Sequence, residues 1–536
     1  MKNWIKNFFT DKKAVHQDNE PFPIVWDNSL ISIYQFLLPY KDADKLPETA
    51  QTLPDESSND SELKWAAGAM DGVMNHHGGA PSEQNCVEQI IALLTTISAQ
   101  PNKHDIEQLY TLIKTQGTLS FIDDLNDAII KIEVDFDKLY KFIYWLATNS
   151  PDREIVKFSI AVLGRFTAEQ TELFLLLGMH EEFTLFSAVA LQNTLSSPEE
   201  VESALLTLAK KVHSWGRIHL VERLARNPSQ EVKNWLLREG YRNSVMYEYL
   251  AYTCATAGEL NQVLEHDVDD LPLLICIGDI LEALIMGGPA EDMHDYNEGA
   301  TVCLNYVKQL VKLPSLVDFS ILSSVLIIRD FVNNMDDESY PNWDEKTKNE
   351  IIAKANDFIQ QDKWLALVKQ DLVTSDSSKF WLAADLYTQL GFDAWDARFD
   401  HQKNHHSDQW FYLMKTDDRS RIEQVITLAK QQNDFSLIAT GPALELGLGM
   451  EYQVHSVLDF ILQELDRFPG IGEDLILIGL NSPVIRNRNM ALNAIEGWDR
   501  QIWSTELKNE LKKLAKIEPN EEIKQRVIAL LNDQNS

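Results

Sequence analysis

The chain has 536 residues, of which 44% are apolar, so it can bury a large core and is not a disordered polypeptide. Its 22 glycines and 18 prolines are few for this length, and this shortage of turn residues argues against an all-β fold. The net charge of −34 repels phosphate backbones and disfavours nucleic-acid binding; it attracts basic proteins, although solubility alone also accounts for it.

The N-terminal segment MKNWIKNFFTDKK (1–13) combines lysines with Trp4, Ile5, Phe8 and Phe9 at helical spacing. A short basic amphipathic helix of this kind lies on a membrane surface or docks on an acidic protein body, and the charge of the remaining chain favours docking. The segment lacks the long apolar core of a signal peptide. No stretch of 18 apolar residues predicts a transmembrane span.

Polar breaks divide the remaining chain. We expect an N-terminal amphipathic segment and polar linker in 1–62, a main helical array in 63–335, an acidic linker in 336–348 and a second helical array in 349–536. Strict alternation of apolar and polar residues is hard to find, so few or no strands are predicted. The helical period is clear after residue 81, at Val87, Ile90, Ile91, Leu94 and Ile97.

Five predicted helices begin with the same signal, a proline that follows a residue able to cap a helix. Four of the five have serine or asparagine at this capping position, and proline is expected at the first helical position, where its missing N–H has no partner. Distances of roughly 30 to 47 residues between such prolines indicate stacked helix pairs. The five starts are Ser150-Pro151, Ser197-Pro198, Asn227-Pro228, Ser482-Pro483 and Glu518-Pro519.

These helix starts resemble the second helices of HEAT-type and armadillo-like repeats, most clearly in 150–240 and 475–531. The resemblance implies an all-α, HEAT-like superhelix, an α-solenoid of stacked antiparallel helix pairs whose concave surface holds a partner. The segments 63–79 and 213–255 also resemble an uncharacterised bacterial family of HEAT-like proteins, some members of which carry the name limonene hydroxylase. That name implies a hydroxylase, which needs a flavin, a haem or a non-haem iron.

The sequence lacks the motifs that would hold a nucleotide or a cofactor. It has no Gly-x-Gly-x-x-Gly after a strand, no phosphate-binding GxxxxGK[ST] loop and no GxSxG elbow. We therefore expect no cofactor. The four cysteines form no Cys-x-x-Cys pair, which indicates reduced thiols in a cytoplasmic protein; they are Cys86, Cys254, Cys276 and Cys303.

The first candidate site lies in 63–79, which we predict to be a helix rich in small residues. Asp71, His76 and His77 have the chemistry of acid–base groups or metal ligands. A close helix crossing with histidines at its C-terminal end explains the same residues.

The second candidate site, in 213–247, is a basic island in an acidic chain. Guanidinium groups of this kind grip an anionic ligand or an acidic peptide, whereas ion pairs between repeats explain them as well. The candidate partner-binding residues are Trp215, Arg217, His219, Arg223, Arg238, Arg242, Asn243 and Tyr247.

The third candidate lies in 400–408, where His401 and His405 have the spacing of two metal ligands on one helix. Gln402 stands where a zinc protease of the HExxH type needs glutamate. A polar loop with exposed histidines is the alternative, and it leaves the chain without a metal site.

We therefore expect a non-enzymatic cytoplasmic scaffold or regulatory protein that binds a protein or peptide along its concave surface, through the 213–247 cluster. The alternative is an enzyme, an oxygenase as the family name implies, with Asp71, His76, His77 and His219 near its site. An open groove would favour the scaffold, and an enclosed pocket with shifted pKa values would favour the enzyme.

Overall fold

The structure is a computed structural model that describes residues 22–56, 65–72, 84–166, 170–313, 317–336 and 339–532. Within these ranges the secondary structure is helical, without a strand, and an isolated β-bridge joins Glu445 to Val484. The prediction of an all-helical chain is confirmed. Among the described residues, no helix combines the length and the apolar character that crossing a membrane requires.

The chain divides into two compact units. One comprises residues up to 316 together with 327–356, and the other comprises 317–326 together with residues from 357 onward. Helices α18 (Phe319–Asn334) and α19 (Glu345–Ile359) each contribute residues to both units. The expected acidic linker, 336–348, lies within the 327–356 part of the first unit, and α19 begins inside it.

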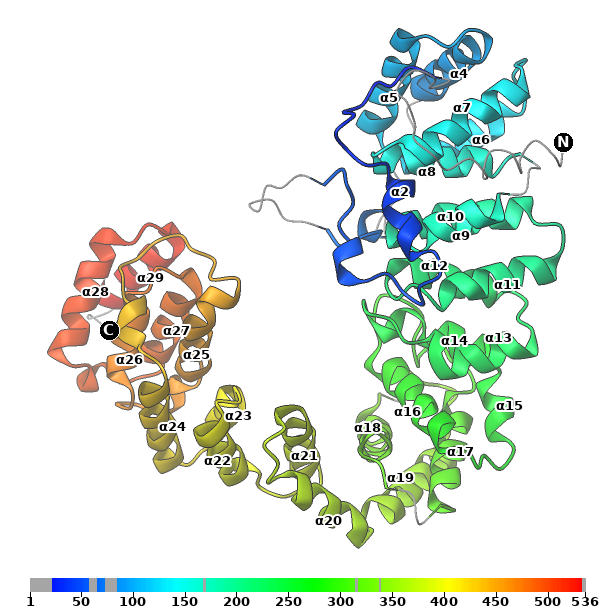
Figure 1. Cartoon of the computed structure of the whole chain (residues 1–536). Coiled ribbons are helices and arrows are strands. Elements are labelled where there is room, and N and C mark those ends of the chain that lie inside the picture. Colours follow the sequence, from blue (N-terminus) through cyan, green and yellow to red (C-terminus); the bar gives the residue numbers. More distant parts are fainter. Residues whose placement is uncertain are drawn as a thin grey trace. The chain divides into compact units, whose positions relative to one another are not determined.

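In the first unit many helices pack on a neighbour in chain order (Figure 1). Pairs form between α4 and α5, α7 and α8, α9 and α10, and α11 and α12, and the second helices of these pairs contact one another in succession. The helices are α2 (Ile33–Leu37), α4 (Gln84–Ala99), α5 (Lys103–Gln116), α6 (Ile122–Ile129), α7 (Phe136–Asn149), α8 (Arg153–Leu163), α9 (Thr171–Gly178), α10 (Glu181–Thr194), α11 (Pro198–Ala209), α12 (Trp215–Leu224), α13 (Gln230–Trp235), α14 (Ala251–Ala257), α15 (Leu260–Leu264), α16 (Leu271–Met286) and α17 (Gly299–Val311), with short 3-10 turns η1 (Leu38–Tyr40), η2 (Glu48–Ala50), η3 (Thr118–Ser120) and η5 (Tyr247–Tyr249) and one π-helical turn η4 (Leu236–Gly240).

The second unit repeats this packing. Helices α23, α25, α27 and α29 contact one another in succession, and α26 contacts both α27 and α28. Its helices are α20 (Asp362–Asp371), α21 (Ser377–Gln389), α22 (Trp395–His405), α23 (Trp410–Met414), α24 (Arg419–Gln432), α25 (Gln453–Leu462), α26 (Glu473–Leu480), α27 (Ile485–Glu496), α28 (Thr505–Ile517) and α29 (Glu521–Asn532), with 3-10 turns η6 (Phe435–Ile438), η7 (Met450–Tyr452), η8 (Leu465–Arg467) and η9 (Arg500–Ile502).

The position of a helix in the stack determines how many of its faces are buried. Helix α8 contacts α5, α6, α7 and α10, and accordingly every residue from Ile155 to Leu163 is buried. Helix α28 contacts α26 and α29 and buries a single apolar stripe at helical spacing, Leu507, Leu511 and Leu514. The apolar stripes are therefore the main source of stability, at roughly 25 cal/mol per Å² of buried surface.

The proline-containing helix starts differ from the prediction in a consistent way. Only α11 has proline at its first position, with Ser197 as its cap. Helices α8, α13, α27 and α29 begin two residues after their prolines, so the predicted position was wrong for these four. The reason is a turn before the helix, in which the side chain preceding proline accepts a hydrogen bond from the N–H two residues later, as Ser150 does from Asp152, Ser482 from Val484 and Glu518 from Asn520.

An N-terminal stretch, residues 22–56, runs beside the helices of the first unit (Figure 1, dark blue). Its Trp26 ring lies 4.9 Å from the ring of Trp145 in α7. Its polar contacts with residues further along the chain include those of the Lys211 ammonium with the Ala43 carbonyl (2.7 Å), the His180 ring with the Gln51 carbonyl (3.2 Å) and the Arg153 N–H with Asp55 (2.9 Å). The basic segment 1–13 lies outside the described residues.

Candidate functional site

The segment that carries Asp71 is described from 65 to 72 and is not one continuous helix. Gly68 has a φ of +71°, so helical backbone begins only at Ala69, and the predicted helix through this glycine was wrong. The small residues do permit a close approach, as predicted. A Cβ on Gly68 would lie 2.6 Å from the Glu181 carbonyl oxygen, and one on Gly72 would lie 2.3 Å from the Trp215 ring.

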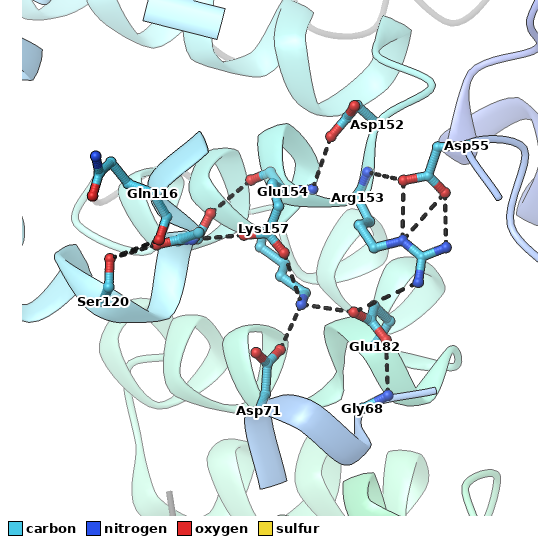
Figure 2. A network of polar contacts seen from close by, with 12 residues as sticks. Asp55, Gly68, Asp71, Gln116, Ser120, Asp152, Arg153, Glu154, Lys157 and Glu182 are labelled. Atoms are coloured by element: carbon cyan, nitrogen blue, oxygen red, sulfur yellow. Dashed lines mark hydrogen bonds and ion pairs between the residues drawn. The ribbon is translucent and has the colours of Figure 1, made fainter. Parts of the chain in front are cut away.

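Three carboxylates converge on the ammonium group of Lys157 (Figure 2). Its Nζ lies 2.6 Å from Asp71, 2.7 Å from Glu182 and 3.1 Å from Glu154, and its side chain is only 3% exposed. Asp71 belongs to the 65–72 segment, Glu154 lies beside Lys157 on α8, and Glu182 comes from α10. The buried lysine therefore joins three parts of the chain through charge.

Arg153 extends this network to the N-terminal stretch. Its guanidinium lies 3.0 Å from Asp55, 3.1 Å from Glu56 and 3.9 Å from Glu182. Figure 2 shows Glu182 between the two cations, where it also accepts a hydrogen bond from the Gly68 N–H at 2.8 Å. The Glu182 carboxylate thus contacts the 65–72 segment directly and is linked to the 22–56 stretch through Arg153.

The neighbouring acidic residue, Glu181, contacts a different helix from Glu182. Its carboxylate accepts hydrogen bonds from the backbone N–H groups of His213 (2.7 Å), Ser214 (2.8 Å) and Gly216 (2.6 Å). These groups lie at the N-terminus of α12, where the unpaired N–H groups and the helix dipole favour an anion. Glu181 therefore fixes α10 to α12, while Glu182 fixes α10 to α8.

The network shifts the pKa values of two of its carboxyl groups in opposite directions. Burial raises the pKa of Asp71 above its ordinary value, although Lys157 opposes the shift. Burial acts in the same direction on Glu182, but Lys157, the Gly68 N–H and Arg153 outweigh it and hold the pKa of Glu182 below its ordinary value. The surrounding carboxylates raise the pKa of Lys157 despite its burial, so this lysine stays charged.

Cavities lie elsewhere in the first unit. One of about 470 Å³ is lined by residues of α15, α17 and α19, and another of about 740 Å³ lies between α4 and α5. Neither is lined by Asp71 or His219. His76 and His77 lie outside the described residues. In the described part of the chain, the Asp71 side chain serves as a contact between segments.

Within the 213–247 cluster, Arg217 points into the protein. Its guanidinium is buried and donates to the carbonyls of Val212 (2.8 Å), Ala209 (2.9 Å), Arg242 (2.9 Å) and Glu239 (3.2 Å). These carbonyls lie at the ends of α11 and η4, where a cation is favourable. Arg217 therefore holds two helix ends together and presents no donor to a partner.

Three more predicted residues are buried beside it: Trp215, His219 and Asn243. Asn243 donates to the Ser214 carbonyl at 3.0 Å, and the half-buried Arg223 donates to the His219 carbonyl at 2.8 Å. This half of the cluster is internal structure between α12 and the turn after η4.

The remaining arginines, Arg238 and Arg242, lie nearer the surface. Arg238 forms an ion pair with the N-cap residue of α16, and Arg242 forms one with a residue inside α16. Arg238 lies 2.6 Å from Asp270. Arg242 donates to the Tyr241 hydroxyl at 3.0 Å and lies 3.8 Å from Asp279, which accepts from that hydroxyl at 2.6 Å. Both arginine side chains keep a solvent-facing part, 38% and 47% exposed.

Two exposed apolar side chains follow them in the chain. Met246 and Tyr247 are 39% and 40% exposed, and the Tyr247 ring packs edge-on against Tyr241 at 5.5 Å. We call Arg238, Arg242, Met246 and Tyr247 the Arg242 surface. Of the predicted partner-binding residues, Arg238, Arg242 and Tyr247 belong to it.

His401 and His405 lie in α22, which continues to His405, so the expected polar loop was wrong for these two. His406 follows the helix, and His405 and His406 are exposed, as expected. His401 is buried against the ring of Phe380 at 3.7 Å. Its two ring nitrogens lie 2.7 Å from the Ser407 hydroxyl and 3.1 Å from the Thr374 carbonyl. No group of three or more histidine, cysteine or acidic residues suited to a metal ion occurs in the described ranges.

Comparisons with known proteins add little to this geometry. No protein-family model matches the chain, and no curated protein matches it. Among solved structures, the crystal structure of an engineered protein is 15% identical, covers 84% of this chain and 100% of its own, and has a TM-score of 0.23. A TM-score this low carries no argument about fold or function.

Proposed function

We propose that this protein is a non-enzymatic scaffold or regulatory protein, built as a HEAT-like helical-repeat array, that binds a protein or peptide partner through the Arg242 surface. The supporting observation is the division of the 213–247 cluster into a buried half and an exposed half. Arg217 and Asn243 bond to backbone groups and hold η4 and the turn after it in place. Arg242 and Tyr247 are then presented on a rigid support.

The chemistry of this surface suits a partner that offers both carboxylates and apolar groups. The exposed ion pairs of Arg238 and Arg242 are each worth less than about 1 kcal/mol, so a partner carboxylate can replace Asp270 or Asp279 at small cost. Tyrosine, methionine and arginine are residue types enriched at protein interfaces. The two cavities described above are not lined by Asp71 or His219, so they give no support to the oxygenase alternative.

The test is quantitative affinity purification from a lysate of the source organism. Wild type is compared with Arg242→Ala/Tyr247→Ala and with a control pair elsewhere on the surface, Arg526→Ala/Phe392→Ala. Arg526 is also an ion-paired arginine with partial exposure, and Phe392 is 40% exposed. We leave Arg217 unchanged in these variants, because its removal would unsettle the fold.

The expected result is a stoichiometric protein partner retained by wild type and by the control pair, and recovered at least tenfold less with Arg242→Ala/Tyr247→Ala. Equal recovery with that variant would place the contact elsewhere. Absence of any stoichiometric partner from the wild-type sample would contradict the scaffold function.

A further inference from the structure

A short segment of the second unit exposes large apolar side chains. We call residues 437–450 the leucine segment. Large apolar residues are usually buried, and a contiguous exposed group of them marks an interaction site. The exposed side chains are Leu437 (71%), Leu444 (60%), Leu446 (68%), Leu448 (68%) and Met450 (85%).

Contacts with the start of α27 fix the backbone of this segment. Arg488, which makes one of these contacts, is itself buried and bonds both carboxylate oxygens of Glu518 at 2.8 and 2.9 Å. The contacts are the Gly441 N–H to the Asn481 carbonyl (2.8 Å), the Glu445 N–H to the Pro483 carbonyl (3.3 Å), the Ile485 N–H to the Glu445 carbonyl (3.0 Å) and the Arg488 guanidinium to the Ala443 carbonyl (2.7 Å).

Gly447 explains how the leucines come to face solvent. Its φ is +72°, and a Cβ at this position would lie 2.6 Å from a methyl carbon of Val484. The glycine therefore seats the backbone on Val484 while Leu446 and Leu448, on either side, stay exposed. Because the backbone is already ordered, a partner that covers these leucines loses little additional conformational entropy on binding.

The charge around the segment determines which partner suits it. Residues 431–466 contain six acidic residues and no lysine or arginine, and two of the six, Asp459 and Glu464, are buried in ion pairs with residues outside this range. Glu445, within the segment, and Glu451, the residue that follows it, are both exposed. An apolar ridge with an acidic border complements an apolar ridge with a basic border.

The backbone also favours a helical partner over an added strand. Gly447 and Gly449 both have positive φ, +72° and +107°, which interrupts extended conformation after Leu446. Strand addition needs a longer regular edge than this. A row of projecting leucines instead matches the apolar stripe of an amphipathic helix.

We propose that the leucine segment is the docking surface for a basic amphipathic helix of a partner protein. The apolar stripe of the helix covers Leu444, Leu446 and Leu448, and its lysines or arginines lie beside Glu445 and Glu451. This contact extends the proposed scaffold function to the second unit and does not depend on the Arg242 surface.

The probe is a labelled synthetic helix of about 14 residues, four turns long, with leucine on one face and lysine on the other. Binding to the full chain is measured by fluorescence anisotropy. The test variant is Leu444→Ser/Leu446→Ser/Leu448→Ser. The matched control, Val373→Ser/Leu382→Ser/Ile517→Ser, removes exposed apolar residues of the same unit outside the segment.

We expect wild type and the control to bind the probe alike, and the leucine variant to bind at least tenfold more weakly. Glu445→Gln/Glu451→Gln should bind severalfold more weakly at low salt, and a probe with glutamate in place of lysine at least tenfold more weakly. Equal binding by the leucine variant would overturn the proposal, because the probe would then report only the general negative charge.

Two further measurements distinguish a partner helix from other molecules that could cover the leucine segment. Co-sedimentation of wild type, but not of the leucine variant, with phosphatidylcholine vesicles would overturn the proposal in favour of a membrane surface. A concentration-dependent dimer of wild type in sedimentation velocity, absent in the leucine variant, would overturn it in favour of a second copy of the chain. Failure of the Arg242 surface test leaves these results unaffected.

Discussion

Replacing Lys157 by methionine should destabilise the first unit strongly. The ammonium lies 2.6 to 3.1 Å from three carboxylates. At an effective dielectric constant of about 20, each such contact has a gross Coulomb energy of about 5–6 kcal/mol. Burial of the ammonium and repulsion among the carboxylates offset most of this sum. Removing one partner of a buried ion pair typically costs about 3–5 kcal/mol, and we expect a loss in this range.

Native-state hydrogen exchange of amides in α8 and α10 measures this free energy within the first unit. The exposed Lys210→Met is the control, because its partner Glu231 is 3.7 Å away and largely exposed; we expect a change within about 0.5 kcal/mol. Adding Asp71→Asn and Glu182→Gln to Lys157→Met should recover part of the loss, since the uncompensated charges are then absent.

The pH dependence of the free energy of unfolding tests the role of Lys157 in a second way. In wild type the pKa of Glu182 lies below its ordinary value, so the stability it contributes is complete above about pH 4.5 and is lost as the pH falls further. Without Lys157, burial would raise the pKa of both Asp71 and Glu182, and the folded variant would lose stability as the pH rises through those values. Its deficit should therefore be larger at pH 8 than at pH 5. A deficit below about 1 kcal/mol, or one equal at the two pH values, would refute the reasoning.

Three further substitutions test other contacts. Arg217→Met should cost about 2–4 kcal/mol, because buried carbonyls lose their donor; unchanged exchange at the end of α11 would disprove this. Gly68→Ala should destabilise the protein more than Gly391→Ala. Gly391 has a φ of +89° and open space where a Cβ would lie, so its substitution should cost only about 1–2 kcal/mol. Equal shifts in the thermal unfolding temperature would be inconsistent with the tight packing at Gly68. Arg488→Met should cost about 3–5 kcal/mol by leaving the Glu518 carboxylate unpaired, and wild-type exchange protection in α27 would contradict it.

The helical period could be predicted from the sequence because it depends on local spacing of apolar residues, as in α4. The residues at which the helices begin were harder to predict from the sequence. Pro151 and Pro483 mark a turn before the helix, and the sequence does not distinguish that turn from a proline inside the first helical turn. Only Ser197-Pro198 has the predicted form.

The residue types of the candidate site could be predicted from the sequence, but the direction in which each side chain points could not. The sequence shows an arginine at both positions but not whether its guanidinium faces solvent or internal carbonyls. The roles of Arg217 and Arg242 could therefore not be distinguished from the sequence. Lys157 was missed, although a lone lysine within the apolar run REIVKFSIAVL is a detectable sign of a buried ion pair. The exposure of Leu446 was also missed, since it depends on how Gly447 packs on Val484.

The contacts of residues 22–56 have a consequence for synthesis of the chain on the ribosome. Most helices contact neighbours in sequence and can fold as each pair emerges. Asp55, Gln51 and Ala43, in contrast, meet residues that lie 98, 129 and 168 positions further on. At translation rates of about 5–20 residues per second, this stretch waits roughly 5–30 s for its partners. This stretch therefore reaches these contacts later than helices that pair with a neighbour in sequence, and until then a chaperone can bind both the stretch and the uncovered faces of α8 to α12.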